Sequence, residues 1–218
     1  MIHTMEADGI QLEFGQRKIL TDIYIKCQTG KITGLLGRNG QGKSCLMNII
    51  YGSLKNADKS IRFDNIAVVH PFKKTHLLRY LPQFNFIPGS LTLKRIFQDF
   101  NIDFPEFEKE FPDYKLRYTT TFNNLSAGQR RLIEIYLIIK SPAQFVILDE
   151  PFTHIMPRHI EIIQDIIIKE KERKGFLITD HMYQYVMDIC DDLYLLKDGK
   201  IHLTKGPDSI ESLGYIRL

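Results

Sequence analysis

Alternating apolar and polar residues near the start of the chain predict two β-strands, each with one buried face. The alternate apolar positions are Ile10, Leu12 and Phe14 in the first segment and Ile23, Ile25 and Cys27 in the second. A period of two residues is typical of a strand, because successive side chains point to opposite faces of the sheet. Both segments are therefore expected to form half-buried strands.

Short apolar runs later in the chain predict more strands. Phe145–Leu148 and Phe176–Thr179 are brief and almost continuously apolar, as strands buried in a parallel sheet usually are. Ile32–Leu36 is a third run of this kind. Further strands are expected at Ile61–Val69 and Leu77–Leu81, and a hairpin around the Asp198-Gly199 turn is expected to join Leu193–Leu196 to Ile201–Leu203.

Apolar residues at helical spacing predict the remaining elements. Ala127–Lys140 is apolar at Leu132, Ile135, Tyr136 and Ile139, and Arg158–Lys174 is expected to be a second long helix. Between Phe84 and Asn123 the composition changes, and aromatic residues become frequent. Phe104, Phe107 and Phe111 recur there at helical spacing. This segment predicts a small, mainly helical subdomain inserted into an α/β core.

Composition and charge narrow the class of protein. The chain has 218 residues, of which 44% are hydrophobic, and 29 basic against 26 acidic residues give a net charge of +3. This length allows one substantial core, and so mild a charge argues against a direct nucleic-acid partner. Lys169–Lys174 alternates in sign and is expected to form a solvated helix face.

Nothing in the sequence predicts a membrane span or a secretory signal. No apolar stretch approaches the roughly 18–20 residues that cross a bilayer. Residues 1–10 lack the basic-then-apolar plan of a signal peptide. The expected location is the cytosol, with any membrane contact made through a partner.

The cysteines and histidines show no metal-binding pattern. Cys27, Cys45 and Cys190 have an odd count and no paired spacing, so they are expected to be small buried side chains, with Cys45 open to thiol reagents. His154 and His159 are five residues apart, which places them off a common helical face.

Residues 37–44 read GRNGQGKS and match the phosphate-binding pattern G-x-x-x-x-G-K-[ST] at every fixed position. They follow the apolar run at Ile32–Leu36 and precede the helix-compatible stretch Cys45–Tyr51. The glycines let successive N–H groups turn toward phosphate oxygens, and the helix N-terminus and Lys43 add positive charge. The alternative is a glycine-rich turn that contains Lys-Ser by chance. It does not explain why an apolar run precedes the loop and a helix-compatible stretch follows it. The sequence predicts a nucleoside triphosphate site formed by Gly37, Arg38, Asn39, Gly40, Gln41, Gly42, Lys43, Ser44 and Cys45.

Two acidic residues follow the buried run that ends at Leu148. Asp149 is placed to hold Mg²⁺ directly or through water, together with the Ser44 hydroxyl. Glu150 lies one residue further, where a carboxylate could polarise an attacking water. The alternative is that both residues only cap the following turn.

The segment Leu125-Ser126-Ala127-Gly128-Gln129 starts a helix with a hydroxyl and a glycine, which can form a second anion site. Alone it could equally be an ordinary helix cap. In this chain it stands in order with the phosphate loop, Gln83, Asp149-Glu150 and His181. The whole set resembles the nucleotide-binding subunit of ABC transporters, over nearly the full length of the chain.

The resemblance implies one ABC-type ATPase domain over residues 1–218. Its fold class would be α/β: a P-loop NTPase core with an antiparallel β subdomain and a small helical subdomain inserted at about residues 84–140. The implied cofactors are ATP and Mg²⁺. The implied partners are a transmembrane permease subunit, which the aromatic-rich segment would receive, and a second ATPase subunit, with a homodimer expected. No direct nucleic-acid contact is expected, and the chain would sit at the inner face of the membrane through the permease.

The resemblance also assigns roles. The expected catalytic residues are Lys43, Gln83, Glu150 and His181, and the expected metal-holding residues are Ser44, Gln83 and Asp149. Phe14 would stack on adenine, and Ser126, Ala127, Gly128 and Gln129 would contact the γ-phosphate held by the other subunit. The blander alternatives are a core strand residue for Phe14, an exposed loop amide for Gln83 and a capping histidine for His181.

Two positions depart from the family pattern. Ala127 stands where the commonest form has glycine, and Met156 stands where a loop after the catalytic carboxylate usually has an Asp. A methionine does not accept the hydrogen bonds that a carboxylate makes across the dimer. The chemical residues are intact, so an active ATPase is expected. Two other classes remain: a soluble ABC-type ATPase that acts on ribosomes or nucleic acid, and a nucleotide-gated binding protein with negligible turnover.

Overall fold

A computed structural model describes residues 1–55 and 57–204. The first layer is an antiparallel sheet with the strand order β2-β1-β4-β5. Its strands are β1 (Thr4–Phe14), β2 (Arg17–Gln28), β4 (Asp58–Phe63) and β5 (Ile66–Ala67). The alternate apolar residues of β1 and β2 are buried, except at Phe14, where β1 ends and the side chain is 54% exposed.

A second sheet has the order β10-β9-β3-β8-β7-β6, and only β10 pairs antiparallel. Its bounds are β3 (Ile32–Leu36), β6 (Leu78–Leu81), β7 (Phe145–Asp149), β8 (Gly175–Thr179), β9 (Asp192–Lys197) and β10 (Lys200–Thr204). Every residue of β3, β7 and β8 is buried, which confirms the prediction of buried strands at these runs. Their carboxyl ends meet at one edge.

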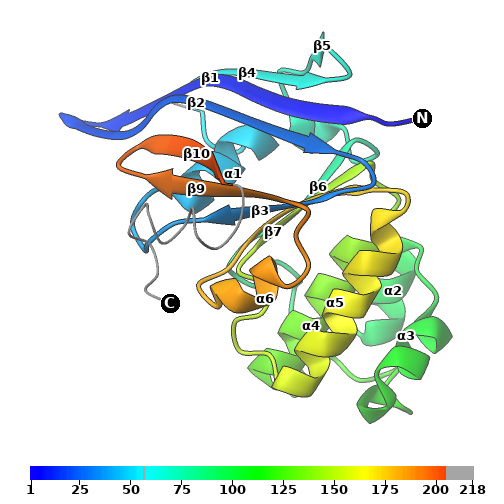
Figure 1. Cartoon of the computed structure of the whole chain (residues 1–218). Coiled ribbons are helices and arrows are strands. Elements are labelled where there is room, and N and C mark those ends of the chain that lie inside the picture. The colour runs from blue at the N-terminus through cyan, green and yellow to red at the C-terminus, as the bar shows by residue number, and fades with distance from the viewer. Residues whose placement is uncertain (56, 205–218) are drawn as a thin grey trace.

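Helix α1 (Lys43–Tyr51) lies between the two sheets (Figure 1). Its buried residues Leu46, Met47, Ile49 and Ile50 join one core cluster with apolar residues of both sheets. This packing holds the N-terminal end of α1 against the sheet that contains β3. The loop between β3 and α1 is therefore supported at both of its ends.

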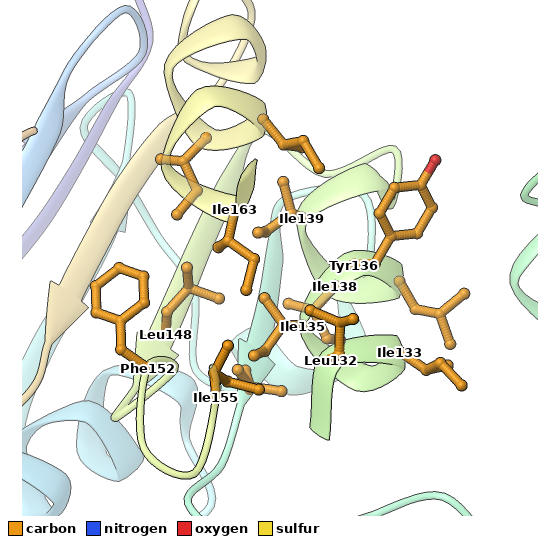
Figure 2. Close-up of a cluster of buried hydrophobic side chains, with 14 of the residues drawn as sticks. Leu132, Ile133, Ile135, Tyr136, Ile138, Ile139, Leu148, Phe152, Ile155 and Ile163 are labelled. Atoms are coloured by element: carbon orange, nitrogen blue, oxygen red, sulfur yellow. The ribbon is translucent and has the colours of Figure 1, made fainter. Parts of the chain in front are cut away.

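The other helices cover the opposite face of the second sheet and extend away from it (Figure 1). They are α2 (Leu93–Phe100), α3 (Phe104–Glu110), α4 (Ala127–Lys140), α5 (Pro157–Lys171) and α6 (Tyr183–Met187), with single 3-10 turns at Pro112–Tyr114 and Phe122–Asn124. A further 3-10 turn, Pro71–Lys73, contacts α1 and β6. Figure 2 shows the apolar side chains of α4 packed against β7 and α5, with Ile135, Leu148 and Ile163 among them.

The aromatic-rich segment includes α2 and α3, and its rings pack on α4 as part of the same apolar core as the second sheet. The ring of Phe107 lies 5.2 Å from Phe97, 5.1 Å from Phe111 and 4.9 Å from Tyr136 of α4, between ring centroids. The helical spacing of the phenylalanines is thus realised in α3 and its C-terminal end. The fold is that of a P-loop NTPase with an antiparallel sheet and an added helical layer, as the fold class predicted.

Three local predictions are wrong. Only Cys27 is buried as expected, whereas Cys45 and Cys190 are half-buried. Ile61–Val69 is not one strand, because Asp64 and Asn65 adopt positive φ angles of 50° and 66° and turn the chain between β4 and β5. Lys169–Lys174 is not a fully solvated face, because Glu170 and Lys174 are buried where the C-terminal ends of α4 and α5 meet. Lys140, Arg173 and Lys174 all donate to or pair with the Glu170 carboxylate, at 3.0, 2.6 and 3.0 Å.

Glu170→Gln is expected to lower the free energy of unfolding by about 3 kcal/mol near neutral pH, because buried Lys174 loses its carboxylate. Burial acts to raise the pKa of Glu170, but the Arg173 hydrogen bond and the Lys174 charge outweigh it and lower the pKa. This stabilisation is therefore present above the unfolded-state pKa and is lost as the pH falls through the folded-state pKa. Urea unfolding at neutral and acidic pH tests this, with exposed Glu161→Gln as control. A difference from wild type that persists undiminished in acid would contradict it.

Candidate nucleotide site

The predicted phosphate loop borders a cavity of 390 Å³ at the carboxyl edge of the second sheet. The cavity gathers residues from four separate parts of the chain. Its lining is Phe14, Arg17, Ile19, Asn39, Gly40, Gly42, Lys43, Ser44, Cys45, Gln83 and Glu150. Phe14 and most of the predicted phosphate loop thus line one cavity, whereas Gly37, Arg38 and Gln41 are not part of its lining.

Backbone conformation explains why glycine is needed in the loop. Gly40 and Gly42 have φ angles of 79° and 100°, which side chains rarely adopt. A Cβ at Gly42 would also lie 2.8 Å from Ile19 Cγ2. Gly42 is the residue that precedes α1, so the free N–H groups of the first helical turn face the loop.

Lys43 brings a buried ammonium group to the loop. Its Nζ donates to the carbonyl oxygens of Gly37 and Arg38, at 2.5 and 3.3 Å. Burial lowers the pKa of Lys43, and the nearby Glu150 and Asp149 carboxylates oppose that shift. An anion in the cavity would favour the charged form further and could replace the carbonyl contacts.

Three oxygen-bearing side chains meet beside the loop. Ser44 Oγ donates to Asp149 Oδ1 at 3.2 Å, and Gln83 Nε2 lies 3.0 Å from Ser44 Oγ and 3.4 Å from Asp149 Oδ1. A hydroxyl, an amide and a carboxylate match the hard oxygen ligands of Mg²⁺, which also keeps waters and takes phosphate oxygens. The donor set therefore fits the predicted metal. Across residues 1–55 and 57–204, no cluster of three His, Cys, Asp or Glu side chains is arranged for a metal.

Asp149 is fixed at both carboxylate oxygens. Tyr80 OH donates to Oδ2 at 3.0 Å, while Oδ1 receives Ser44 and Gln83. Burial raises the pKa of Asp149, and the hydrogen bonds from Tyr80 and Ser44 act in the opposite direction. Sequence reasoning identified Asp149 but not Tyr80.

Glu150 leaves the strand in a left-handed conformation. Its φ is 51°, and its N–H donates to the Thr179 carbonyl at 2.8 Å, so the side chain turns toward the cavity. His181 Nδ1 lies 3.7 Å from Glu150 Oε2 and 3.3 Å from Thr153 Oγ1. The structure thus brings the expected base and the expected switch histidine together. A strained backbone beside a cavity is common at catalytic positions.

Ser126, Gly128 and Gln129 lie outside the nucleotide cavity and line a different cavity of 200 Å³. Ser126 caps α4 in a capping box: its Oγ accepts from Gln129 N at 3.2 Å, and Gln129 Oε1 accepts from Ser126 N at 3.0 Å. The helix-cap alternative is therefore realised, and the contact with a partner's γ-phosphate stays a prediction. The Ser126 oxygen accepts from the backbone, so its proton stays available for an anion.

Gly128 packs against the loop that follows Glu150. A Cβ at Gly128 would lie 2.8 Å from the His154 carbonyl oxygen, and His154 itself has a φ of 65°. Met156, the departure noted in the sequence, lines the same small cavity and is 59% exposed. The first turn of α4 and this loop thus form one surface, and its exposed part includes an apolar side chain.

Arg131 and Glu134, on the buried face of α4, join the site to neighbouring elements and were missed by sequence reasoning. The Arg131 guanidinium donates to the carbonyl oxygens of Pro82, Asp149 and Glu150, at 2.7, 3.0 and 3.2 Å. Glu134 Oε1 accepts from the backbone N–H groups of Phe86 and Ile87, at 2.9 and 3.2 Å. Two charges among the apolar positions of a buried helix were the available signal.

These features define a P-loop nucleotide-binding protein. The chain belongs to the ABC transporter family, whose family model matches residues 20–153. The ATPase domain of this family binds ATP. Among the described residues, no helix has the length and apolar character of a membrane span.

Curated relatives are named for both import and export. The chain is 27% identical to the lipopolysaccharide export system ATP-binding protein LptB of Haemophilus influenzae, over 94% of this chain and 92% of LptB. It is 27% identical to the galactose/methyl galactoside import ATP-binding protein MglA of Treponema denticola, over 92% of this chain but only 44% of MglA. The chain thus spans less than half the length of that relative.

Solved structures match the fold. An ATP-binding subunit of an ABC transporter superposes with a TM-score of 0.81 at 20% identity, over 97% of this chain and 93% of the other. A nucleotide-free ATP-binding cassette gives a TM-score of 0.77 at 23% identity, over 96% and 94%. At these identities the likeness supports the architecture alone.

Proposed function

We propose that this chain is the ATP-binding and ATP-hydrolysing subunit of an ABC transporter, which powers a separate transmembrane permease. The observation that carries the proposal is the convergence of Lys43, Ser44, Gln83 and Glu150 on one cavity, with His181 Nδ1 3.7 Å from the Glu150 carboxylate. Relatives at 27% identity are named as ATP-binding proteins of import and export systems. The chain would act at the cytoplasmic face of the membrane through the permease.

The proposed chemistry is phosphoryl transfer to water, which depends on positioning and charge neutralisation. Lys43 and the loop N–H groups would hold the β- and γ-phosphates. Mg²⁺, held by Ser44, Gln83 and Asp149, would neutralise phosphate charge. Glu150 would orient and polarise the attacking water, and His181, within 3.7 Å of Glu150, would orient that carboxylate and contact the γ-phosphate.

A second copy of the chain is part of the proposal. Ser126 and Gly128 lie on a surface that is not part of their own nucleotide cavity. A head-to-tail homodimer would place this surface over the partner's nucleotide and enclose two ATP molecules. The exposed Met156 would then meet the partner through apolar contact in place of a carboxylate's hydrogen bonds.

The permease is proposed to dock at a third cavity, of 320 Å³, between α1, β6 and the segment after Gln83. We call it the docking cavity. It is lined by Asn48, Tyr51, Ser53, Arg79, Tyr80, Pro82, Phe84, Phe86 and Ile138. Phe84 lines this cavity and is 71% exposed, so a large apolar side chain is in contact with solvent. Glu134 holds the Phe86 N–H, so a displacement here would reach α4.

A complementation experiment tests the function and the homodimer together. Ser126→Arg is expected to leave ATP binding to the isolated chain within about twofold of wild type, since Ser126 does not line its own nucleotide cavity. Phosphate release should fall to background. Lys43→Ala should also be inactive, because it removes the phosphate-binding cation.

A mixture of the two inactive variants should recover turnover. In the mixed dimer, the Ser126→Arg copy still supplies an intact phosphate loop and the Lys43→Ala copy supplies an intact serine. Recovery requires that one site be built from two chains. Full activity of Ser126→Arg alone, at a dilution where size-exclusion chromatography shows monomer, would refute the shared site.

A further inference from the structure

The docking cavity reaches the carboxylate of Asp149 through one tyrosine. Tyr80 and Asn48 line the docking cavity, and neither lines the nucleotide cavity. Asp149 Oδ1 faces Ser44 and Gln83, whereas Oδ2 receives the Tyr80 hydroxyl at 3.0 Å. The two oxygens of one carboxylate are thus held by residues of two different cavities.

The direction of the Tyr80 hydrogen bond is fixed by Asn48. Asn48 Nδ2 donates to the Tyr80 oxygen at 3.1 Å and to the Ser44 carbonyl at 2.8 Å. Because the Tyr80 oxygen accepts from this amide, its own proton is free to point at Asp149. Asn48 also lies on α1, one turn after Ser44, so the amide ties the tyrosine to the helix that follows the phosphate loop.

The ring of Tyr80 is held by the wall of the docking cavity. It is nearly buried on β6, and its centroid lies 5.1 Å from that of Tyr51, another residue of that wall. A segment that docks here contacts the rings that set the position of the hydroxyl. A shift of the Tyr80 ring would therefore act on Asp149 directly through the Tyr80 hydroxyl.

We propose that Tyr80 is a positioning residue, which holds Asp149 from the docking cavity so that Oδ1 stays directed at Ser44 and the metal position. The inference rests on the proposed function, because it needs Asp149 to hold Mg²⁺ beside bound ATP. Its physical basis is preorganisation: a carboxylate with one oxygen anchored keeps the rotamer that presents the other.

The test compares Tyr80→Phe with Tyr51→Phe. Both remove one hydroxyl from the same wall and keep the ring, but only Tyr80 contacts Asp149. Calorimetry measures the affinity of full-length chain for a non-hydrolysable ATP analogue, once with Mg²⁺ and once with EDTA. The ratio of the two affinities reports the metal's contribution without turnover.

Tyr80→Phe is expected to reduce this ratio about tenfold, the size of a lost hydrogen bond to a charged group. Its affinity in EDTA and its melting temperature serve as folding checks and should stay near wild type. Tyr51→Phe should keep the wild-type ratio. An unchanged ratio in Tyr80→Phe, or an equal loss in Tyr51→Phe, would overturn the inference while leaving the proposed function intact. A wild-type chain that binds no nucleotide would overturn both.

Discussion

Glu150→Gln is expected to reduce ATP turnover by about 10²–10⁴-fold while leaving ATP bound, the range for loss of a positioned general base. Glutamine keeps the shape of the side chain and its backbone conformation at φ 51°, but it does not take a proton from water. Lys43 and Ser44, which are proposed to contact the phosphates, are unchanged in this variant. Binding and chemistry should therefore separate in this variant.

The physical readout of that separation is the oligomeric state. In the proposed mechanism, closure of the dimer around ATP is driven by γ-phosphate contacts and is reversed by hydrolysis. With hydrolysis blocked, Glu150→Gln should elute as a dimer with ATP and Mg²⁺ on size-exclusion chromatography, and as a monomer with ADP. Glu161→Gln, an exposed carboxylate on α5, is the matched control and should behave as wild type. A Glu150→Gln chain that stays monomeric with ATP would argue against the dimer.

Short contiguous motifs predicted those parts of the site whose residues are neighbours in the sequence. The phosphate loop is contiguous, and it stands between an apolar run and a helix, so the sequence alone located Gly40, Gly42, Lys43 and Ser44. Asp149 and Glu150 were found for a similar reason, because they follow a short apolar run that is typical of a buried strand. Their meeting with Gln83 follows from the parallel order β6-β7, in which both strands end at one edge.

Contacts between residues far apart in the sequence could not be predicted from hydrophobic periodicity. Tyr80 belongs to a strand whose apolar pattern gives no hint that its hydroxyl meets Asp149, 69 residues later. The buried pairing of Glu170 was hidden for a similar reason: its neighbours in sequence alternate in sign, and only the packing of α4 on α5 removes it from water. The short helix α6 has five residues, too few for a helical period to register.

Arg131 shows how the missed residues bear on the predicted ones. One guanidinium joins the carbonyl of Pro82, directly before Gln83, to the carbonyls of Asp149 and Glu150. Burial lowers the pKa of Arg131, opposed first by Glu134. The planar guanidinium group of arginine can donate to three carbonyl oxygens in two directions. The ammonium group of lysine does not reproduce this geometry. The residue therefore ties the segment before Gln83 to the carboxyl end of β7.

Arg131→Met is expected to lower the free energy of unfolding by about 3–5 kcal/mol, because it leaves buried carbonyls and the Glu134 carboxylate without their cation. Burial already raises the pKa of Glu134. The penalty should therefore be largest above the folded-state pKa, where Glu134 is charged, and should shrink as the pH falls and the carboxyl takes a proton. The penalty of Glu170→Gln also shrinks in acid, so both variants should approach the wild type as the pH falls, and Arg131→Met should do so at the higher pH because burial raises the pKa of Glu134 whereas the pKa of Glu170 is lowered. Urea unfolding at several pH values measures both.

A double variant separates the charge from the packing. Glu134→Leu in the Arg131→Met background removes the unpaired carboxylate, so the double variant should be destabilised by less than the sum of the two single variants. Arg131→Lys, which keeps the charge but loses the planar guanidinium group, should fall between wild type and Arg131→Met. Strict additivity of the two single changes would show that Arg131 acts on the carbonyls alone. The strand ends would then be held without help from Glu134, and α4 would have no charged connection from the nucleotide site to the segment at Phe86.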